Sequence, residues 1–307
     1  MAGLNTVVIG GGTGFIGSAL GLLLIKNGYK VLNVSRMPGA SNIVWDELLR
    51  SGLPKSTVAV VNLAGQNILD PKRRWTPGFK QNVWNSRVNT TSSLAKSIVA
   101  NEEKPKVFIT ISGVGIYPPS SSAEYTEESP VEPFDFLSEL AVAWEKAAKL
   151  PSTSGVRQVT VRSGVVLGRN GGMIQQLFLP FFFGLGGPIA SGNQFLPWIY
   201  IDDMARLIHF AIENEKVCGV LNGVAPQIIT NREFSSAFGK AMWRPSILPV
   251  PKFALDIAFG EERAKVMTDG QKVVPKRVLE YGFKYDYPDI NSACVKCARL
   301  FNDFGLE

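Results

Sequence analysis

The stretch TVVIGGGTGFIG, residues 6–17, decides the fold of this chain. Its first five residues form a short apolar run, which predicts a buried strand. Apolar residues from Phe15 to Leu24 then recur at helical spacing, and Gly28 is a natural end for such a helix. The stretch therefore predicts a strand, a glycine loop and a helix in immediate succession.

The loop of this unit holds Gly11, Gly14 and Gly17 in the spacing GxxGxxG. The chain must turn sharply there, let a diphosphate approach the backbone, and pack the helix close to the strand. The free N–H groups and the positive dipole end of the helix favour phosphate. A P-loop is excluded because Ser18-Ala19 replace its Lys-Ser/Thr pair, and a tight turn without a ligand is the alternative reading. We predict a dinucleotide site with contacts at Gly11, Thr13, Gly14, Phe15, Ile16 and Gly17.

Strands and helices keep alternating after this unit. Further strands are predicted at 30–35, 58–63, 107–112 and 156–162, and helices at 79–100 and 136–150. The strand at 58–63 is apolar throughout, as parallel strands buried on both faces are. The alternation predicts an α/β fold with a doubly wound parallel sheet of the Rossmann type.

The regular alternation of strands and helices ends after Arg162. An uncharged segment rich in Gly and Pro follows at 170–201. Beyond it we predict a helix at 202–214, a strand at 220–224, a helix that begins at Asn231 and then a tail with several prolines. We predict a dinucleotide-binding domain at 1–168 and a smaller C-terminal lobe at 169–307, with 178–198 as an uncharged lid over the substrate. The boundary is soft, because chain beyond Arg162 can return to the sheet.

The end of the second strand indicates which dinucleotide is bound. An NAD site places an acidic residue there to accept the ribose hydroxyls. Here the strand ends in Ser35-Arg36, and no Asp or Glu occurs between Gly17 and Trp45. A guanidinium and a hydroxyl suit a 2′-phosphate. We predict NADP(H) in preference to NAD(H); the alternative is an ordinary surface arginine at 36.

Composition narrows the class of protein. The chain has 307 residues, 45% of them apolar and 19% charged, which excludes a disordered chain. A net charge of +6, spread along the chain, is too weak to indicate nucleic acid. Three cysteines exclude a disulfide framework and fit a reducing compartment. The single histidine, His209, argues against a metal site, and none is predicted.

Two uncharged runs bear on location. The first 25 residues lack the basic region of a signal peptide. The run at 170–201 holds too many Gly and Pro residues for a membrane helix. We expect a soluble intracellular protein, cytoplasmic by the absence of a targeting signal, with no membrane partner. The sequence does not indicate an oligomeric state.

The motifs together resemble the extended short-chain dehydrogenase/reductase superfamily, in its sugar-epimerase-like branch. The resemblance is carried by GGTGFIG at 11–17, NLAG at 62–65, RSGVVLG at 162–168 and WIYIDD at 198–203. More narrowly, the chain resembles the SDR39U1-type epimerase family, in WDEL at 45–48, RRW at 73–75, FLPW at 195–198, NGVAP at 222–226 and GQKVVP at 270–275. Nearly the whole chain is covered, and the resemblance implies an NADP-dependent oxidoreductase.

The resemblance also implies further cofactor contacts, at Leu63, Ala64, Gly65, Asn82, Arg87 and Val165. Leu63 and Ala64 would lie along the ribose and diphosphate, and Val165 against the nicotinamide. From spacing alone, Arg87 reads equally well as an arginine at the edge of a helix with its stem on apolar surface. The resemblance favours a phosphate or ribose contact.

The catalytic pattern of the superfamily is broken. Its Ser, Tyr and Lys positions fall at Gly113, Leu137 and Ala141, none of which can transfer a proton. Ser112, Tyr117, Tyr125 and Lys146 are conceivable substitutes, but each reads more naturally as structural. No catalytic residue is therefore assigned.

Three weaker features complete the picture. Cys294 and Cys297 form CxxC without a second ligand pair, so we expect neither zinc nor redox use. His209 lies in an apolar helix and reads as packing. The basic run Lys72-Arg73-Arg74 fits an anionic substrate and a solvated loop equally well.

The sequence thus predicts hydride transfer between NADP(H) and a small substrate carbonyl or alcohol. The rival hypothesis is an NADPH-binding sensor without catalysis, which the empty positions 137 and 141 motivate. A third possibility is a structural protein whose dinucleotide-binding fold no longer binds a nucleotide.

Overall fold

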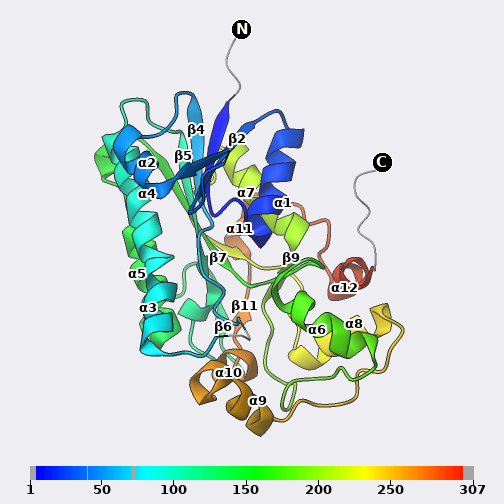
Figure 1. Cartoon of the computed structure of the whole chain (residues 1–307). Helices are drawn as coiled ribbons and strands as arrows, with labels where there is room; N and C mark the ends of the chain where they lie inside the picture. The colour runs from blue at the N-terminus through cyan, green and yellow to red at the C-terminus, as the bar shows by residue number, and fades with distance from the viewer. Residues whose placement is uncertain (1–4, 40, 71–72, 300–307) are drawn as a thin grey trace.

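The computed structural model of the chain describes residues 5–39, 41–70 and 73–299. Lys72, which the basic run at 72–74 includes, lies outside these residues. A parallel sheet forms the centre, helices cover both of its faces, and a second group of helices lies beyond one end (Figure 1).

The central sheet has seven strands in the order β10-β7-β5-β4-β1-β2-β3. All neighbours pair in parallel, with Val8 opposite Leu32 on one side and Val60 on the other. The strands are β1 (Thr6–Gly10), β2 (Lys30–Ser35), β3 (Asn42–Val44), β4 (Thr57–Asn62), β5 (Val107–Gly113), β7 (Arg157–Ser163) and β10 (Gly219–Gly223). The chain order reverses between β1 and β4, so loops at their carboxyl ends diverge and leave a crevice for a ligand. The predicted doubly wound sheet is confirmed.

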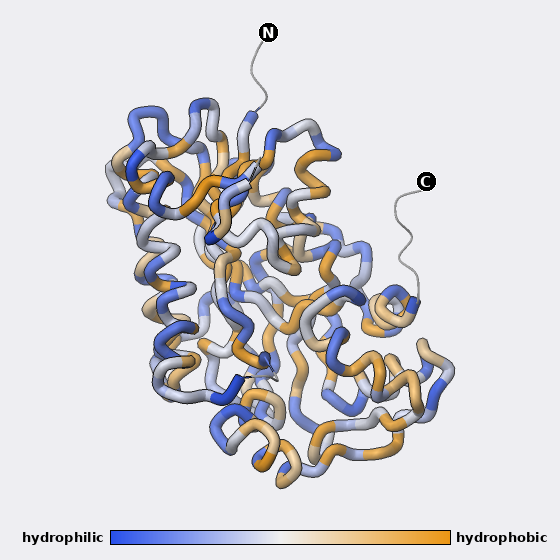
Figure 2. Tube along the Cα trace, viewed as in Figure 1, coloured by the Kyte–Doolittle hydropathy of each residue, from blue (hydrophilic) through white to orange (hydrophobic). Residues whose placement is uncertain are grey.

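Alternating side chains of each strand enter two different cores. Val7 and Ile9 pack with helices α1 (Phe15–Lys26) and α7 (Ile201–Glu213) on one face, whereas Val8 packs with α2 (Trp45–Ser51) and α4 (Val88–Ala100) on the other. Figure 2 shows this apolar character along the central strands. Burial on both faces explains the apolar strand sequences.

A separate core holds helices of the C-terminal half together. It joins short strands β8 (Val165–Leu167) and β9 (Trp198–Tyr200) to helices α6 (Gly172–Phe182), α8 (Asn231–Ala241) and α12 (Ile290–Ala298). The remaining elements are α3 (Pro77–Asn85), α5 (Phe136–Ala147), α9 (Lys252–Phe259), α10 (Glu261–Thr268), α11 (Lys276–Glu280), β6 (Glu124–Tyr125), β11 (Lys272–Val273) and the 3-10 turns Val114–Ile116 and Ser152–Ser154. Strand β10 returns from the C-terminal half to the sheet edge, as the soft boundary allowed. The division into two domains stays a prediction.

One predicted helix is broken. The single helix expected at 79–100 is two helices, α3 and α4, separated at Ser86 and Arg87. The Ser86 hydroxyl accepts from the Gln66 backbone N–H at 3.0 Å and donates to the Val83 carbonyl at 2.9 Å. A serine that bonds to the backbone in this way competes with the helical ladder. The start was also missed, since Thr76 caps α3 ahead of Pro77.

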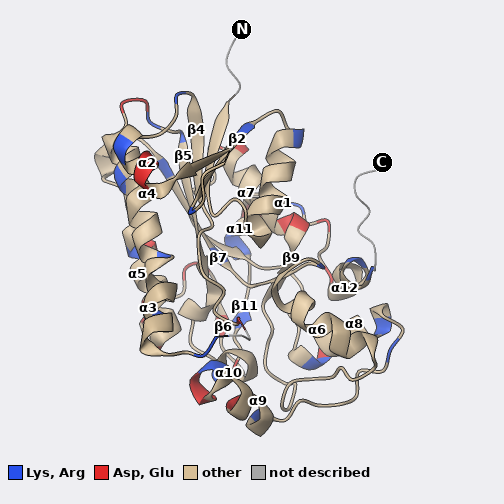
Figure 3. Cartoon of the chain, in the orientation of Figure 1, with Lys and Arg blue, Asp and Glu red and all other residues tan. Residues whose placement is uncertain are grey.

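In the part of the chain that the structure describes, α6 is the only helix that lies wholly within the uncharged segment at 170–201. It ends at Phe182, and Gly184 shortly after it has a left-handed conformation (φ +73°). Among the described residues, no helix is both long and apolar enough to cross a bilayer. Acidic and basic residues are spread over both parts of the molecule (Figure 3).

Candidate functional site

The glycine loop turns where the carboxyl ends of β1 and β4 meet. Gly11 has φ +74°, and a β carbon there would lie 2.8 Å from Cα of Ala64. Gly17 sits against the same loop, because its β carbon would lie 2.4 Å from the Gly11 carbonyl oxygen. Both positions therefore exclude a side chain for steric reasons.

The N-terminus of α1 is left open. Gly14 is its N-cap residue, no side chain caps it, and its first turn holds no acidic residue. Thr13 and Gly14 are exposed, while Phe15 and Ile16 are half-buried. The Phe15 ring packs on Gly168 and Gly171, where added β carbons would come within 2.7 and 2.5 Å of it. The helix thus presents its N–H groups and dipole to an anion.

Gly12 is a crowded position that the GxxGxxG spacing did not single out. A β carbon on Gly12 would lie 1.8 Å from Oδ1 of Asn33 on β2. Its signal in the sequence is the GxGxxG spacing that it forms with Gly14 and Gly17. The loop therefore lies against β2 as well as β4.

The end of β2 carries the predicted phosphate-recognising residues. Ser35 is half-buried and its hydroxyl accepts from the Met37 backbone N–H at 3.2 Å. Arg36 is exposed and forms no ion pair with any described residue. A hydroxyl and an unpaired guanidinium thus stand side by side at this edge.

The end of β4 is organised by buried Asn62. Its Oδ1 accepts from the Ala64 backbone N–H at 3.1 Å, and its Nδ2 donates to Thr91 Oγ1 at 2.7 Å. These bonds fix the turn that carries Leu63, Ala64 and Gly65.

Arg87 lies next to this turn. A β carbon on Gly65 would lie 3.0 Å from Cζ of Arg87, whose guanidinium is 5.2 Å from the centre of the Trp144 ring. It donates weakly to the Val83 carbonyl and the Ser86 hydroxyl, at 3.3 and 3.4 Å, and meets no carboxylate among the described residues. Burial lowers its pKa to about 10. A desolvated cation without a counter-charge suits an anionic ligand.

For two of the predicted cofactor contacts, Asn82 and Val165, the structure shows no contact with the glycine loop or with Arg87. Asn82 is exposed on α3, and its side chain makes no hydrogen bond to the other described residues. Val165 starts β8, half-buried, with its backbone N–H donating to the Pro197 carbonyl at 2.8 Å. The structure therefore brings together the glycine loop, Leu63 to Gly65 and Arg87.

The positions of the usual catalysts hold no proton donor. Ala141 is buried, and Leu137 packs beside the apolar cluster of Phe79 and Val83. Ser112 donates to Glu145 at 2.7 Å, and Glu145 is held by both Nε and Nη2 of Arg162 at 2.8 and 2.9 Å. The Ser112 hydroxyl is thus engaged in a buried network.

Tyr117 belongs to the same network. It is fully buried, accepts from Arg162 at 2.8 Å, and its hydroxyl lies 2.9 Å from Asn222 Oδ1 and 3.0 Å from the Thr126 carbonyl. Burial raises the pKa of Tyr117. Tyr125 stacks on it with ring centres 5.1 Å apart, and Lys146 is exposed. These arrangements agree with structural roles for the four conceivable substitutes.

The cysteine pair and the histidine lie in packed surroundings. Cys294 and Cys297 are fully buried in α12, and burial raises the pKa of both thiols, to about 12 for Cys297. Within the described chain, no cluster of metal-ligating residues occurs. His209 packs edge-on against Tyr29 with ring centres 6.2 Å apart.

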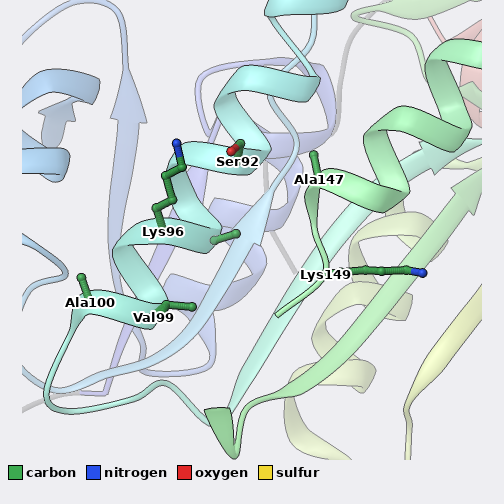
Figure 4. Close-up of a pocket in the computed structure, with 7 residues that line it drawn as sticks. Ser92, Lys96, Val99, Ala100, Ala147 and Lys149 are labelled. Carbon is green, nitrogen blue, oxygen red and sulfur yellow. The ribbon is translucent and has the colours of Figure 1, made fainter. Parts of the chain in front are cut away.

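A hollow lies between α4 and the C-terminal end of α5 (Figure 4). It is lined by Ser92, Ala95, Lys96, Val99, Ala100, Ala147 and Lys149. Its two lysine side chains point away from one another, so they form no common site (Figure 4).

Comparison with known proteins agrees with this geometry. The sequence model of the NAD dependent epimerase/dehydratase family matches residues 7–222, and a domain of unknown function, DUF1731, matches residues 250–297. Epimerase family protein SDR39U1 of Homo sapiens is 51% identical over 94% of this chain and 97% of its own length. Epimerase family protein YfhF of Bacillus subtilis is 36% identical over 94% of this chain and 96% of its own.

Solved structures show the same fold. The crystal structure of human SDR39U1 (isoform 2) with NADPH has a TM-score of 0.93 and 50% identity, covering 95% of this chain and 99% of that one. UDP-N-acetylglucosamine 4-epimerase from Bacillus cereus has a TM-score of 0.75 at 19% identity, over 95% and 98% of the two chains, which bears on the fold alone.

Proposed function

The chain belongs to the NAD dependent epimerase/dehydratase family and, within it, to the group of SDR39U1-type epimerase family proteins, and on that premise we propose that it binds NADP(H) and acts as an oxidoreductase on a small substrate. The observation that carries the proposal is the pairing of an open glycine loop with two arginines, Arg36 and Arg87, that face no carboxylate of the described residues. The relative solved with NADPH supports the choice of cofactor.

The residues present fit this cofactor. Gly11 and Gly12 leave no room for side chains, so the backbone itself forms the cradle for a diphosphate. Arg36 would hold the 2′-phosphate and Ser35 would donate its hydroxyl, with no acidic residue nearby on β2 to repel it. Arg87, beside Gly65, would contact the ribose or diphosphate.

When bound, the cofactor supplies hydride exchange at C4 of its nicotinamide. The chain's own contribution is binding and orientation. Val165 would border the nicotinamide, and the segment at 178–198 would exclude water above the substrate. With Gly113, Leu137 and Ala141 at the usual catalytic positions, the chain assigns no side chain to proton transfer.

That same observation favours a second candidate, an NADPH-binding sensor without turnover. Tyr117 and Ser112 are both engaged in the Glu145–Arg162 network, so neither hydroxyl is free to serve a substrate. The two candidates share the cofactor and differ only in chemistry.

Calorimetric titration with NADPH and NADH tests the shared step. We expect NADPH to bind at least tenfold more tightly; no heat from either form would overturn both candidates. Consumption of NADPH across a panel of aldehydes and ketones then separates them. Turnover supports the oxidoreductase, and tight binding without turnover supports the sensor.

A further inference from the structure

Large apolar side chains lie exposed at the end of the molecule that holds α6, α8 and α9 (Figures 1 and 2). They come from the end of α6 and the loop after it, from the segment after α8, and from α9. We call this group the apolar end surface, and its members are Leu179, Phe183, Leu185, Trp243, Ile247, Leu248, Phe253 and Ile257. Each of them is at least 47% exposed, and Trp243 is 90% exposed. A large exposed apolar patch marks an interaction site.

Backbone hydrogen bonds join the two segments that carry most of this surface. The Leu248 N–H donates to the Gly186 carbonyl at 3.3 Å, and the Val250 N–H donates to the Pro188 carbonyl at 2.9 Å. The Val250 carbonyl in turn accepts from the Ala190 N–H at 2.9 Å. The two segments therefore run side by side, and α9 begins directly after them.

Trp243 is fixed in its exposed position. Its φ is +56°, a left-handed conformation that is rare for a bulky residue. Its backbone N–H donates to the Lys240 carbonyl at 3.0 Å. The next residue, Arg244, donates from its backbone N–H to the Gly239 carbonyl at 2.9 Å and from Nε to the Phe182 carbonyl at 2.8 Å. Such strained positions persist only where the surrounding structure holds them, and they cluster at functional sites.

The apolar end surface has charges of opposite sign at its two ends. Lys240 and Arg244 are exposed at the α8 end, and neither forms an ion pair with a described residue. No acidic residue occurs in the sequence between Glu233 and Asp256. At the other end Glu261 begins α10, where it is exposed and also outside the ion pairs of the described residues, whereas Asp256 is already paired within α9. Basic residues lie beside α8 and acidic residues on α10 (Figure 3).

The area of this surface is that of a protein interface. Its eight side chains expose on the order of 1,000 Å² in total, whereas a standard interface buries about 800 Å² on each partner. Three of the eight, Phe183, Trp243 and Phe253, are aromatic, the type that interface cores favour.

We propose that the apolar end surface is the contact between two copies of this chain, related by a two-fold axis through its middle. Such an axis lays the α8 end of one copy on the α10 end of the other, and the reverse contact follows by symmetry. Lys240 and Arg244 then meet the negative charge of Glu261 at both ends, which fixes the antiparallel orientation. An anionic membrane fits less well, because Glu261 would face its headgroups.

The dimer would also bear on the predicted lid. Leu179, Phe183 and Leu185 belong to the segment at 178–198, so the second copy would hold the start of that segment in place. The proposal does not depend on the proposed cofactor or reaction.

Sedimentation equilibrium of the full chain over a range of concentrations tests the proposal. We expect a reversible equilibrium between monomer and dimer, and at least tenfold weaker dimerisation in Trp243→Ser/Ile247→Ser. Both side chains are exposed, so this variant should keep the thermal stability of the monomer. Leu22→Ser/Ile25→Ser is the matched control, because it removes two apolar side chains of α1 that are 72% and 60% exposed and should leave the dimer intact. Dimerisation that survives the first variant, or that falls equally in the control, overturns the proposal.

Charge reversal at low salt tests the orientation. Lys240→Glu and Glu261→Lys should each weaken dimerisation by about three- to tenfold, since exposed ion pairs contribute modestly. The combined variant should recover most of the affinity, because it restores opposite charges at both ends. Independent losses that add up in the combined variant overturn the antiparallel arrangement.

Hydrogen exchange identifies the face that is used. In the dimer we expect slower exchange of the backbone amides at 179–185 and 243–248 than in the diluted monomer. Protection confined to other faces, or a monomer at every concentration, overturns the proposal. A monomer that floats with phosphatidylserine vesicles, and no longer does so as Trp243→Ser/Ile247→Ser, assigns the surface to a membrane and overturns it as well.

Discussion

Oδ1 of Asn33 occupies the space that a β carbon on Gly12 would need, at 1.8 Å from its ideal position. The contact joins the glycine loop to β2, the strand that ends in Ser35 and Arg36. The proposed diphosphate cradle and the proposed 2′-phosphate contact therefore lie on two segments that touch each other.

Gly12→Ala should displace this loop. We expect a loss of about 1–3 kcal/mol in the free energy of unfolding, as overpacking costs, and at least tenfold weaker NADPH binding. Denaturant unfolding and NADPH titration measure the two effects. Gly78→Ala is the control, because a β carbon there meets nothing within 4 Å; equal behaviour of the two variants would contradict the steric argument.

Arg36→Ala should remove the preference for NADP(H). A hydrogen-bonded charge contact is worth about 1.5–3 kcal/mol, so NADPH affinity should fall by more than tenfold while NADH affinity changes little. Competitive titration of both cofactors gives the ratio. Arg50, exposed on α2, provides the control variant Arg50→Ala. The same loss for both cofactors would refute the assignment.

Tyr117→Phe should destabilise the protein by about 1–3 kcal/mol, because it leaves buried polar partners unsatisfied. Arg162 and Asn222 would both lose a bond to the hydroxyl. Tyr125 stacks on Tyr117, but its hydroxyl makes no hydrogen bond to the described residues. Tyr125→Phe should therefore change the free energy of unfolding by no more than about 0.5 kcal/mol. Urea unfolding measures the free energy of unfolding of both variants. If Tyr117→Phe changes turnover but not this free energy, the structural role of Tyr117 is wrong.

Asp289→Ala should cost about 1 kcal/mol by removing the N-cap of α12. The Asp289 carboxylate accepts from the Ser292 backbone N–H at 3.0 Å, and this bond chiefly holds the pKa of Asp289 below its ordinary value of 3.8. A lowered carboxyl pKa stabilises the fold above 3.8, and that stabilisation disappears as pH falls through the lowered value. The difference in unfolding free energy between wild type and Asp289→Ala should thus be full at neutral pH and shrink in acid. Asp289→Asn, which caps without titrating, should lack this pH dependence.

Thiol labelling at neutral pH should modify Cys218 first. Cys218 is exposed, whereas Cys294 and Cys297 are fully buried and their thiols have raised pKa values. The thiolate is the reactive form, so the buried pair reacts only when α12 opens. Absorbance of a released chromophore counts the fast thiols. Cys218→Ser should abolish the fast phase, and rapid labelling that persists in it would show that α12 is not closed.

The strands and the glycine loop were predictable because their signals are local. Buried parallel strands appear in the sequence as apolar runs, and the glycine spacing in GGTGFIG predicts the turn that follows the first strand. The short strand β3 and helix α2 were missed, since Asn42–Ser51 is brief and has weak periodicity. The break at Ser86 was missed because its cause is a bond to Gln66, twenty residues away.

The site residues stay predictions, and their signals in the sequence are local as well. Spacing placed Gly11, Gly14 and Gly17, and the missing acid after β2 pointed to Arg36. Nothing in the spacing ties Arg87 to Gly65, or shows that Gly12 is held by Asn33.

The sequence by itself determined the parallel sheet, the glycine loop and the absence of the usual catalytic pair, because each of these depends on residues that are close together along the chain. Only the tertiary structure decided that Arg263 reaches the Arg73 carbonyl, that Tyr117 is buried in a hydrogen-bond network and that Arg87 meets no carboxylate in the described part of the chain. The physical reason is that burial and hydrogen-bond partners depend on which distant segments are brought together, and a one-dimensional pattern carries no information on that.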